Sequence, residues 1–102
     1  NALMLPDSMA FLEAAELSAD QRQRIQTART LFAEAGRKGD SLSAETRAWF
    51  EELGIQFGLS NHGITADDLP PLADEAYADP CHATNLIPVT RDDLLAVYEA
   101  AQ

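Results

Sequence analysis

Three capping boxes divide this sequence into helices before any other feature is considered. In such a box a Ser or Thr precedes a helix, and an acidic or amide residue three positions later binds back to it. The spacing occurs at Ser18–Gln21, Thr65–Asp68 and Thr90–Asp93. Alternating apolar and polar segments, which are typical of half-buried strands, are almost missing. The sequence therefore predicts an all-α fold, a helical bundle of about five helices joined by short loops.

Glycines and prolines set the expected boundaries in the first half of the chain. One helix is expected over Ala2–Leu17, where Pro6 is tolerated because it lies in the first turn. The next follows Ser18 and ends near Ala35, because Gly36 suits the left-handed backbone of a helix end. The third begins at Leu42 and ends at Gly54. Its apolar side is expected to be buried and consists of Trp49, Phe50 and Leu53.

The second half of the chain contains two irregular stretches and two helices. Residues 55–63 are expected to form a loop or a short turn. Pro70 and Pro71 are expected to break or restart the helix that runs from Thr65 to about Ala78. Residues 79–88 are again irregular, and the last helix follows Thr90.

Length and charge limit the classes of function that this chain can have. The chain has 102 residues, enough for a single all-helical domain over residues 1–102. It carries seven Lys and Arg against seventeen Asp and Glu, a net charge of −10. This balance argues against a nucleic-acid partner, which needs a basic surface, and against binding to anionic membranes.

No apolar run approaches the length of a membrane span. Cys81 is the only cysteine, which fits a reducing, cytoplasmic location.

Few residues have the chemistry of a catalytic site. His62 and His82 are the only histidines, and neither lies in a metal-binding motif. Cys81 and His82 are adjacent, but catalytic Cys and His usually come from separate parts of a chain, so a structural role is favoured. A structural role is also expected for Asn85, whose side chain is typical of loops closed by side-chain to backbone hydrogen bonds. The acidic pairs are explained by helix capping without a metal.

Two segments resemble the C-terminal part of the iron-containing alcohol dehydrogenases, whose fold is related to dehydroquinate synthase. The opening Asn1-Ala-Leu-Met-Leu-Pro6 is similar to the end of a His-Gly-x-x-Asn-Ala-x-x-Leu-Pro motif. The closing segments resemble a family pattern that reads, in chain order, Leu-Ala, then Ala, then Asp, then Asn-Pro-x-x-x-Thr and finally Asp. They are Leu69–Ala73, Ala76, Asp79–Asn85, Pro88–Thr90 and Asp93. Between them, Leu53–Ile55 and His62–Ile64 match the Leu-Gly-Ile and Gly-Ile positions, so the resemblance spans nearly the whole chain.

The resemblance implies an oxidoreductase. Family members have a nucleotide-binding N-terminal domain and an all-helical C-terminal domain, and they interconvert a small alcohol and an aldehyde. Hydride moves to or from NAD or NADP, while Fe²⁺ or another divalent metal acts as a Lewis acid. The metal ligands of the family are one Asp and three His, all upstream of Asn1, and relatives often form homodimers. This chain is therefore expected to be inactive without the missing N-terminal domain and to hold no cofactor alone.

Only a few functional residues carry over from the family. Asn1 matches an Asn near the last metal ligand. Cys81 lies where some relatives have a cysteine beside the substrate and nicotinamide, His82 is next to it, and Asn85 matches a loop Asn. The family's Asn-Pro-Arg is replaced here by Asn85-Leu-Ile, so the arginine of that pocket is missing. Gln56 replaces a common proline.

An alternative interpretation remains open. The charge of −10 and the single domain also suit a freestanding acidic helical module that binds a protein partner. The opening Asn1, where a Met would be expected, favours a piece of a longer enzyme. A start codon directly before Asn1 would favour the interaction module.

Overall fold

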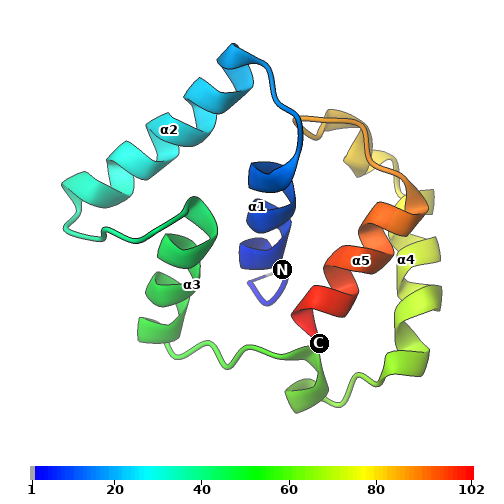
Figure 1. Ribbon diagram of the computed structural model, residues 1–102. Coiled ribbons are helices and arrows are strands. Elements are labelled where there is room, and N and C mark those ends of the chain that lie inside the picture. Colours follow the sequence, from blue (N-terminus) through cyan, green and yellow to red (C-terminus); the bar gives the residue numbers. More distant parts are fainter. Residues whose placement is uncertain (1) are drawn as a thin grey trace. The chain divides into compact units, whose positions relative to one another are not determined.

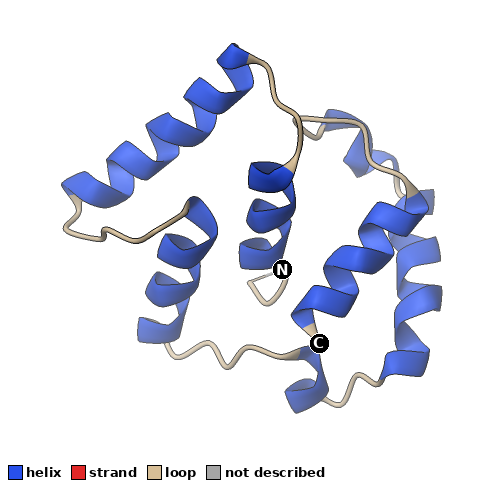
Figure 2. Ribbon diagram, viewed as in Figure 1, coloured by secondary structure: helices blue, strands red, loops and turns tan. Residues whose placement is uncertain are grey.

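A computed structural model describes residues 2–102, which form five α-helices and three short 3-10 helices (Figure 1). No β-strand occurs within residues 2–102 (Figure 2), and the predicted all-α class with about five helices is confirmed. Backbone contacts divide the chain into two compact units. The first unit ends at Ile55, and the second runs from Gln56 to Gln102. A single domain over residues 1–102 stays a prediction.

The first unit contains helices α1 (Leu5–Ala14), α2 (Ala19–Glu34) and α3 (Leu42–Glu52). Helix α1 is shorter than the predicted Ala2–Leu17, although Pro6 does lie in its first turn. The backbone is already extended at Ala15, with φ −76° and ψ 160°. The next helix explains the early end, because its cap residue Ser18 must also be extended to accept a hydrogen bond from the first turn.

The predicted capping box of α2 is confirmed. The Ser18 hydroxyl accepts the amide of Gln21 at 3.2 Å, and the Gln21 side chain accepts the amide of Ser18 at 2.9 Å. At the other end, Gly36 has a φ of +79°, the left-handed conformation that the sequence predicted. None of the residues of α2 is fully buried, so this helix is held by few contacts beyond its own turns.

Helices α1 and α3 pack together, and polar groups of α1 bind the beginning of α3. The carboxylate of Glu13 accepts the backbone amides of Leu42 and Ser43, each at 2.9 Å. These two amides have no partner within α3, because the first turn of a helix leaves its donors free. The hydroxyl of Ser43 also donates to the carbonyl of Pro6 at 2.6 Å. Glu13 therefore caps a helix 29 residues away.

A second polar contact joins α2 to α3. The Arg29 guanidinium lies 2.9 Å from the carboxylate of Glu45, which also accepts the amide of Gly39 at 3.3 Å. Glu45 is only 4% exposed, and a buried carboxylate needs such partners to offset the loss of water. The first half of α3 is thus covered.

The second half of α3 is more open than the sequence predicted. Trp49 is 38% exposed and Leu53 is 63% exposed, while Phe50 is half-buried. The expectation that Trp49 and Leu53 lie in a core was wrong. Their spacing does continue the stripe of Leu42 and Thr46, but α1 and the Arg29 contact cover only the first turns of that stripe.

The second unit is built around helices α4 (Leu69–Ala78) and α5 (Arg91–Ala101), which pack side by side. The short 3-10 helices are η1 (Leu59–His62), η2 (Ala66–Asp68) and η3 (Pro80–Thr84). Its buried side chains come from η1, α4 and α5. They are Leu59, Leu69, Ala73 and Ala101. This is the core that positions the turn at residues 79–85.

Proline and two capping residues shape the beginnings of α4 and α5. The 3-10 turn η2 precedes α4, and Pro70 and Pro71 lie in the first turn of α4, so the predicted restart is confirmed. The carboxylate of Asp68 accepts the amide of Thr65 at 2.8 Å. The carboxylate of Asp93 accepts the amide of Thr90 at 2.9 Å, as the sequence predicted.

The last residue of the sequence is tied into this unit. The carbonyl of Gln102 accepts the amide of Ser60 at 3.4 Å and its hydroxyl at 3.0 Å. The side-chain amide of Gln102 donates to the carbonyl of Ile64 at 3.1 Å. Three hydrogen bonds therefore join the end of α5 to η1 and the loop after it.

Candidate functional site

The turn that follows α4 brings Cys81, His82 and Asn85 together. Asp79 begins it, because its carboxylate accepts the amide of Cys81 at 2.9 Å. The hydroxyl of Thr84 donates to the carbonyl of Cys81 at 3.0 Å, and the amide of Asn85 donates to the carbonyl of His82 at 3.1 Å. These bonds make residues 79–85 an ordered turn rather than the irregular stretch expected from the sequence.

His82 has a structural role at the end of α4. Its ring stacks on Tyr77 with centroids 4.8 Å apart and planes 7° from parallel. Its Nε2 lies 2.9 Å from the carbonyl of Tyr77, which can only accept, so Nε2 carries the hydrogen. The last carbonyls of a helix lack partners within it. His82 therefore satisfies one of them, and its Nε2 is not available as a base while this bond holds.

The Cys81 thiol is exposed but not activated. The nearby Asp79 carboxylate raises the pKa of the Cys81 thiol, first through a hydrogen bond and then through its negative charge. Reactive cysteines have the opposite surroundings, with positive charges that lower the pKa. The geometry thus agrees with the preference for a structural or pocket-lining residue over a nucleophile.

Asn85 is exposed and takes part in the turn through its backbone. The side-chain to backbone bond expected of Asn85 is supplied by its neighbour Thr84. A pocket role for Cys81, His82 and Asn85 stays a prediction. Asn1, the expected neighbour of the metal motif, lies outside the described residues.

The described residues do not fit the metal of the resembled family. Within residues 2–102 no group of three or more His, Cys, Asp or Glu side chains is arranged to hold a metal ion. The acidic residues Asp68 and Asp93 are instead used as caps. His62 is bound to the carbonyl of Gln56 through Nε2 at 2.7 Å.

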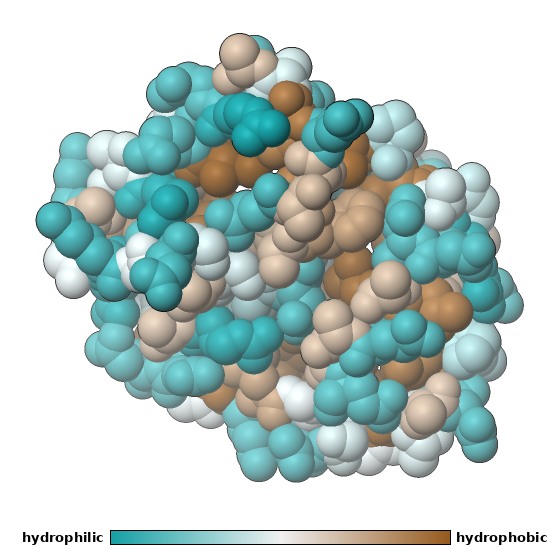
Figure 3. All heavy atoms as spheres, viewed as in Figure 1, coloured by the Kyte–Doolittle hydropathy of each residue, from teal (hydrophilic) through white to brown (hydrophobic). Residues whose placement is uncertain are grey.

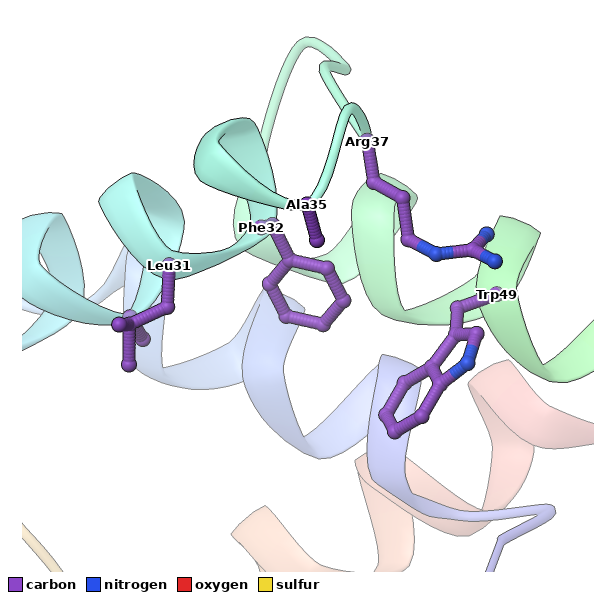
Figure 4. A pocket seen from close by; sticks show the side chains of 6 residues that line it. Leu31, Phe32, Ala35, Arg37 and Trp49 are labelled. Carbon is purple, nitrogen blue, oxygen red and sulfur yellow. The ribbon is translucent and has the colours of Figure 1, made fainter.

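An apolar groove lies between α2 and α3 in the first unit. It has a volume of about 360 Å³ and is lined by Ala28, Leu31, Phe32, Ala35, Arg37 and Trp49. Phe32 and Trp49 meet edge to face with ring centroids 5.8 Å apart, and Figure 4 shows Arg37 extending toward Trp49. Ala28, Phe32 and Ala35 lie on one helix face because they recur at intervals of four and three residues. Arg37 follows the helix and pairs with Glu52 of α3.

Apolar side chains also reach the surface elsewhere, between hydrophilic ones (Figure 3). Among residues 2–102, several large apolar side chains are exposed, two of them in the groove. They are Leu5, Leu31, Trp49, Leu53 and Tyr77. Among the described residues, no helix is both long enough and apolar enough to cross a lipid bilayer.

Fold and site together define an all-helical chain in which Asp68 and Asp93 cap helices and Asp79 and Thr84 close a turn. Its family is shown by comparison with known families. The profile described as "Fe-containing alcohol dehydrogenase family, C-terminal" matches residues 1–102, so the chain belongs to this oxidoreductase family. The resemblance found in the sequence is thereby confirmed. No curated protein and no solved structure matches the chain.

Proposed function

We propose that this chain is the C-terminal helical domain of an NAD(P)-dependent alcohol dehydrogenase that requires iron or another divalent metal. The intact enzyme would interconvert a small alcohol and an aldehyde by hydride transfer. The observation that carries the proposal is the family match over residues 1–102. We further propose a cytoplasmic enzyme that forms a homodimer.

The metal ligands and the nucleotide site are proposed to lie in polypeptide that precedes this chain in the parent enzyme. Support comes from the family match, because the matching profile describes the C-terminal part of these enzymes. The 102-residue chain alone is then expected to be inactive. It would supply one wall of the substrate site, where the hydrogen bonds of Asp79 and Thr84 keep the turn after α4 closed.

We assign Cys81, His82 and Asn85 to the substrate side of that wall. They share a single turn, which Asp79 and Thr84 hold closed. The stack of His82 on Tyr77 fixes the ring, so the turn presents a constant shape rather than a mobile loop. Ile87, just after this turn, stands where the family has an arginine, so the proposed pocket lacks that charged group.

The first experiment compares the 102-residue chain with a longer polypeptide that includes the preceding coding region. Alcohol-dependent formation of NADH or NADPH is followed by absorbance, and bound iron is measured by elemental analysis. We expect activity and metal only in the longer polypeptide. Activity in the 102-residue chain, or a longer polypeptide with neither metal nor dehydrogenase activity, would contradict the proposal.

The pocket assignment has a separate test in the longer polypeptide. Cys81→Ala and Asn85→Ala are expected to raise KM for the alcohol several-fold, about 3- to 10-fold, because each removes a contact to bound substrate. The matched control is Ser60→Ala, which alters a hydroxyl of the same unit that is bound to Gln102. Equal KM values for all three variants would remove these residues from the pocket while leaving the proposed activity intact.

A further inference from the structure

The segment that joins the two units is short and is bound on both sides. It consists of residues 53–58, after α3 and before η1. The boundary between the units falls within it, between Ile55 and Gln56. The hydrogen-bond partners of its backbone groups show which torsions of this segment can change freely. A torsion can change without breaking a hydrogen bond only where the adjoining amide and carbonyl have no partner.

On the α3 side, the chain is fixed as far as the amide of Ile55. Gly54 has a φ of +90°, and its amide donates to the carbonyl of Glu51 at 3.0 Å. The amide of Ile55 donates to the carbonyl of Phe50 at 3.0 Å. This pair of bonds with a left-handed glycine is the Schellman arrangement that ends many helices. It holds the linker rigidly to the first unit up to the nitrogen of Ile55.

On the η1 side, the chain is fixed from the carbonyl of Gln56 onward. That carbonyl accepts Nε2 of His62 at 2.7 Å, and the carbonyl of Phe57 accepts the side-chain amide of Asn61 at 2.9 Å. The carbonyl of Gly58 accepts the amide of Asn61 at 3.0 Å. The turn η1 is itself bound to Gln102. The linker is therefore part of the second unit from this carbonyl.

One peptide group lies between these two anchored ends. Among residues 2–102, neither the carbonyl of Ile55 nor the amide of Gln56 has a hydrogen-bond partner. Gln56 is also exposed, so its side chain is not held by packing. We propose that this peptide group is a hinge, and that the two units reorient as rigid bodies about the torsions of Ile55 and Gln56. Hinges of this kind are a few loop residues that absorb changes in φ and ψ.

The sequence provides a natural pair of probes for this motion. Trp49 is the only tryptophan and lies in the first unit, and Cys81 is the only cysteine and lies in the second. Both are exposed. An aminonaphthalene sulfonate dye on Cys81 accepts energy from Trp49, so time-resolved fluorescence of the labelled 102-residue chain gives the distribution of distances between the units.

Two substitutions at one position test the hinge. Gln56→Pro fixes φ of residue 56 and restricts ψ of Ile55, and it removes an amide that has no partner. Gln56→Ala, the matched control, shortens the side chain without fixing the backbone. We expect a broad distance distribution in the parent chain and in Gln56→Ala. Gln56→Pro should narrow it to about half that width or less. His62→Phe, which frees the carbonyl of Gln56, should broaden it.

A second measurement does not depend on the dye or on any variant. Backbone ¹⁵N relaxation gives the rotational correlation time for the amides of each unit in the unlabelled chain. The hinge predicts shorter times than those of one rigid body of 102 residues, and an increase in Gln56→Pro. A common correlation time equal to that of a rigid body, or a parent distribution as narrow as that of Gln56→Pro, would overturn the proposal. Neither result would bear on the dehydrogenase activity, which is tested separately.

Discussion

Asp79 controls both the shape of the turn after α4 and the acidity of Cys81. Its carboxylate accepts the amide of Cys81 and raises the pKa of the thiol. Asp79→Asn keeps an oxygen that can accept this amide but removes the charge. We therefore expect a lower thiol pKa, more thiolate at neutral pH and faster alkylation of Cys81 by iodoacetamide.

The control for this prediction is Asp74→Asn, which removes an exposed carboxylate of α4 that pairs with Arg91 instead. Alkylation of this variant should proceed at the rate of the parent chain. If Asp79→Asn also reacts at the parent rate, Asp79 does not set the acidity of the thiol.

His82 contributes through a stack and a hydrogen bond, and two substitutions separate them. His82→Phe keeps an aromatic ring on Tyr77 but loses the bond to its carbonyl, so it should lower the free energy of unfolding by about 0.5–1.5 kcal/mol. His82→Ala loses both and should cost more. Urea unfolding followed by circular dichroism measures the difference. Equal losses in the two variants would mean that the stack contributes nothing.

At the scale of elements, Glu13 is one of the residues that bind α1 to α3. Glu13→Ala removes the acceptor of two helix N-terminal amides. We expect a loss of about 1.5–3 kcal/mol in the free energy of unfolding, because hydrogen bonds to a charged group exceed neutral ones. Glu16→Ala, an exposed acid of the next segment, should change stability by less than about 0.5 kcal/mol. If Glu16→Ala lowers the free energy of unfolding as much as Glu13→Ala does, the net charge of the chain, rather than the cap on α3, accounts for the effect.

The capping carboxylate of Asp68 and the ion-paired carboxylate of Glu52 also predict how stability depends on pH. Hydrogen bonds from Thr65 lower the pKa of Asp68 below its ordinary 3.8, and Arg37 lowers the pKa of Glu52 below 4.5. A carboxyl whose pKa is lower in the folded state stabilises that state above its unfolded pKa. This contribution is lost as the pH falls through the folded value. Stability should therefore decrease from about pH 4.5 downward.

Asp68→Asn tests this origin of the acid sensitivity. The variant lacks one of the titrating caps, so its unfolding free energy should fall less steeply between pH 5 and pH 3, a window of about two units around the ordinary values. Denaturant unfolding at a series of pH values gives both slopes. An unchanged slope in Asp68→Asn would assign the acid sensitivity to other groups.

The helix ends set by capping residues and glycines could be predicted from sequence because their causes are local, whereas the early end of α1 at Ala14 could not. Ser18, Thr65 and Thr90 bind groups three residues away, and Gly36 and Gly54 need only their own backbone freedom. Contacts between distant residues left no local signal. The cap that Glu13 provides to Leu42 and Ser43 depends on how α1 packs against α3. No spacing in the sequence contains that information.

The candidate site was predicted less well than the fold. Family resemblance selected Cys81, His82 and Asn85, but their partners were not foreseen. The bond from His82 to the carbonyl of Tyr77 spans five residues and depends on the turn of Pro80–Thr84. The exposure of Trp49 was missed for a related reason. A helical stripe shows which side chains share a face, but not how far a neighbour covers it.

For the molecule as a whole, the two units should differ in their response to a core mutation. Leu69 is 2% exposed in the core of the second unit. Leu69→Ala should cost about 2–5 kcal/mol and should speed amide hydrogen exchange mainly in residues 56–102. The first unit has its own contacts, so its amides should change little. Equal acceleration in both units would mean that they unfold as one.

The hydrogen bonds of Gln102 affect where a tag or a surface anchor can be attached without disturbing the fold. Its carbonyl and side-chain amide hold η1 and the following loop to the end of α5, so a tag or linker attached there would pull on the core of the second unit. In a force measurement, an anchor at Gln102 would first break these hydrogen bonds, so the earliest signal would be local unfolding around η1. Attachment before residue 2 would leave these bonds untouched.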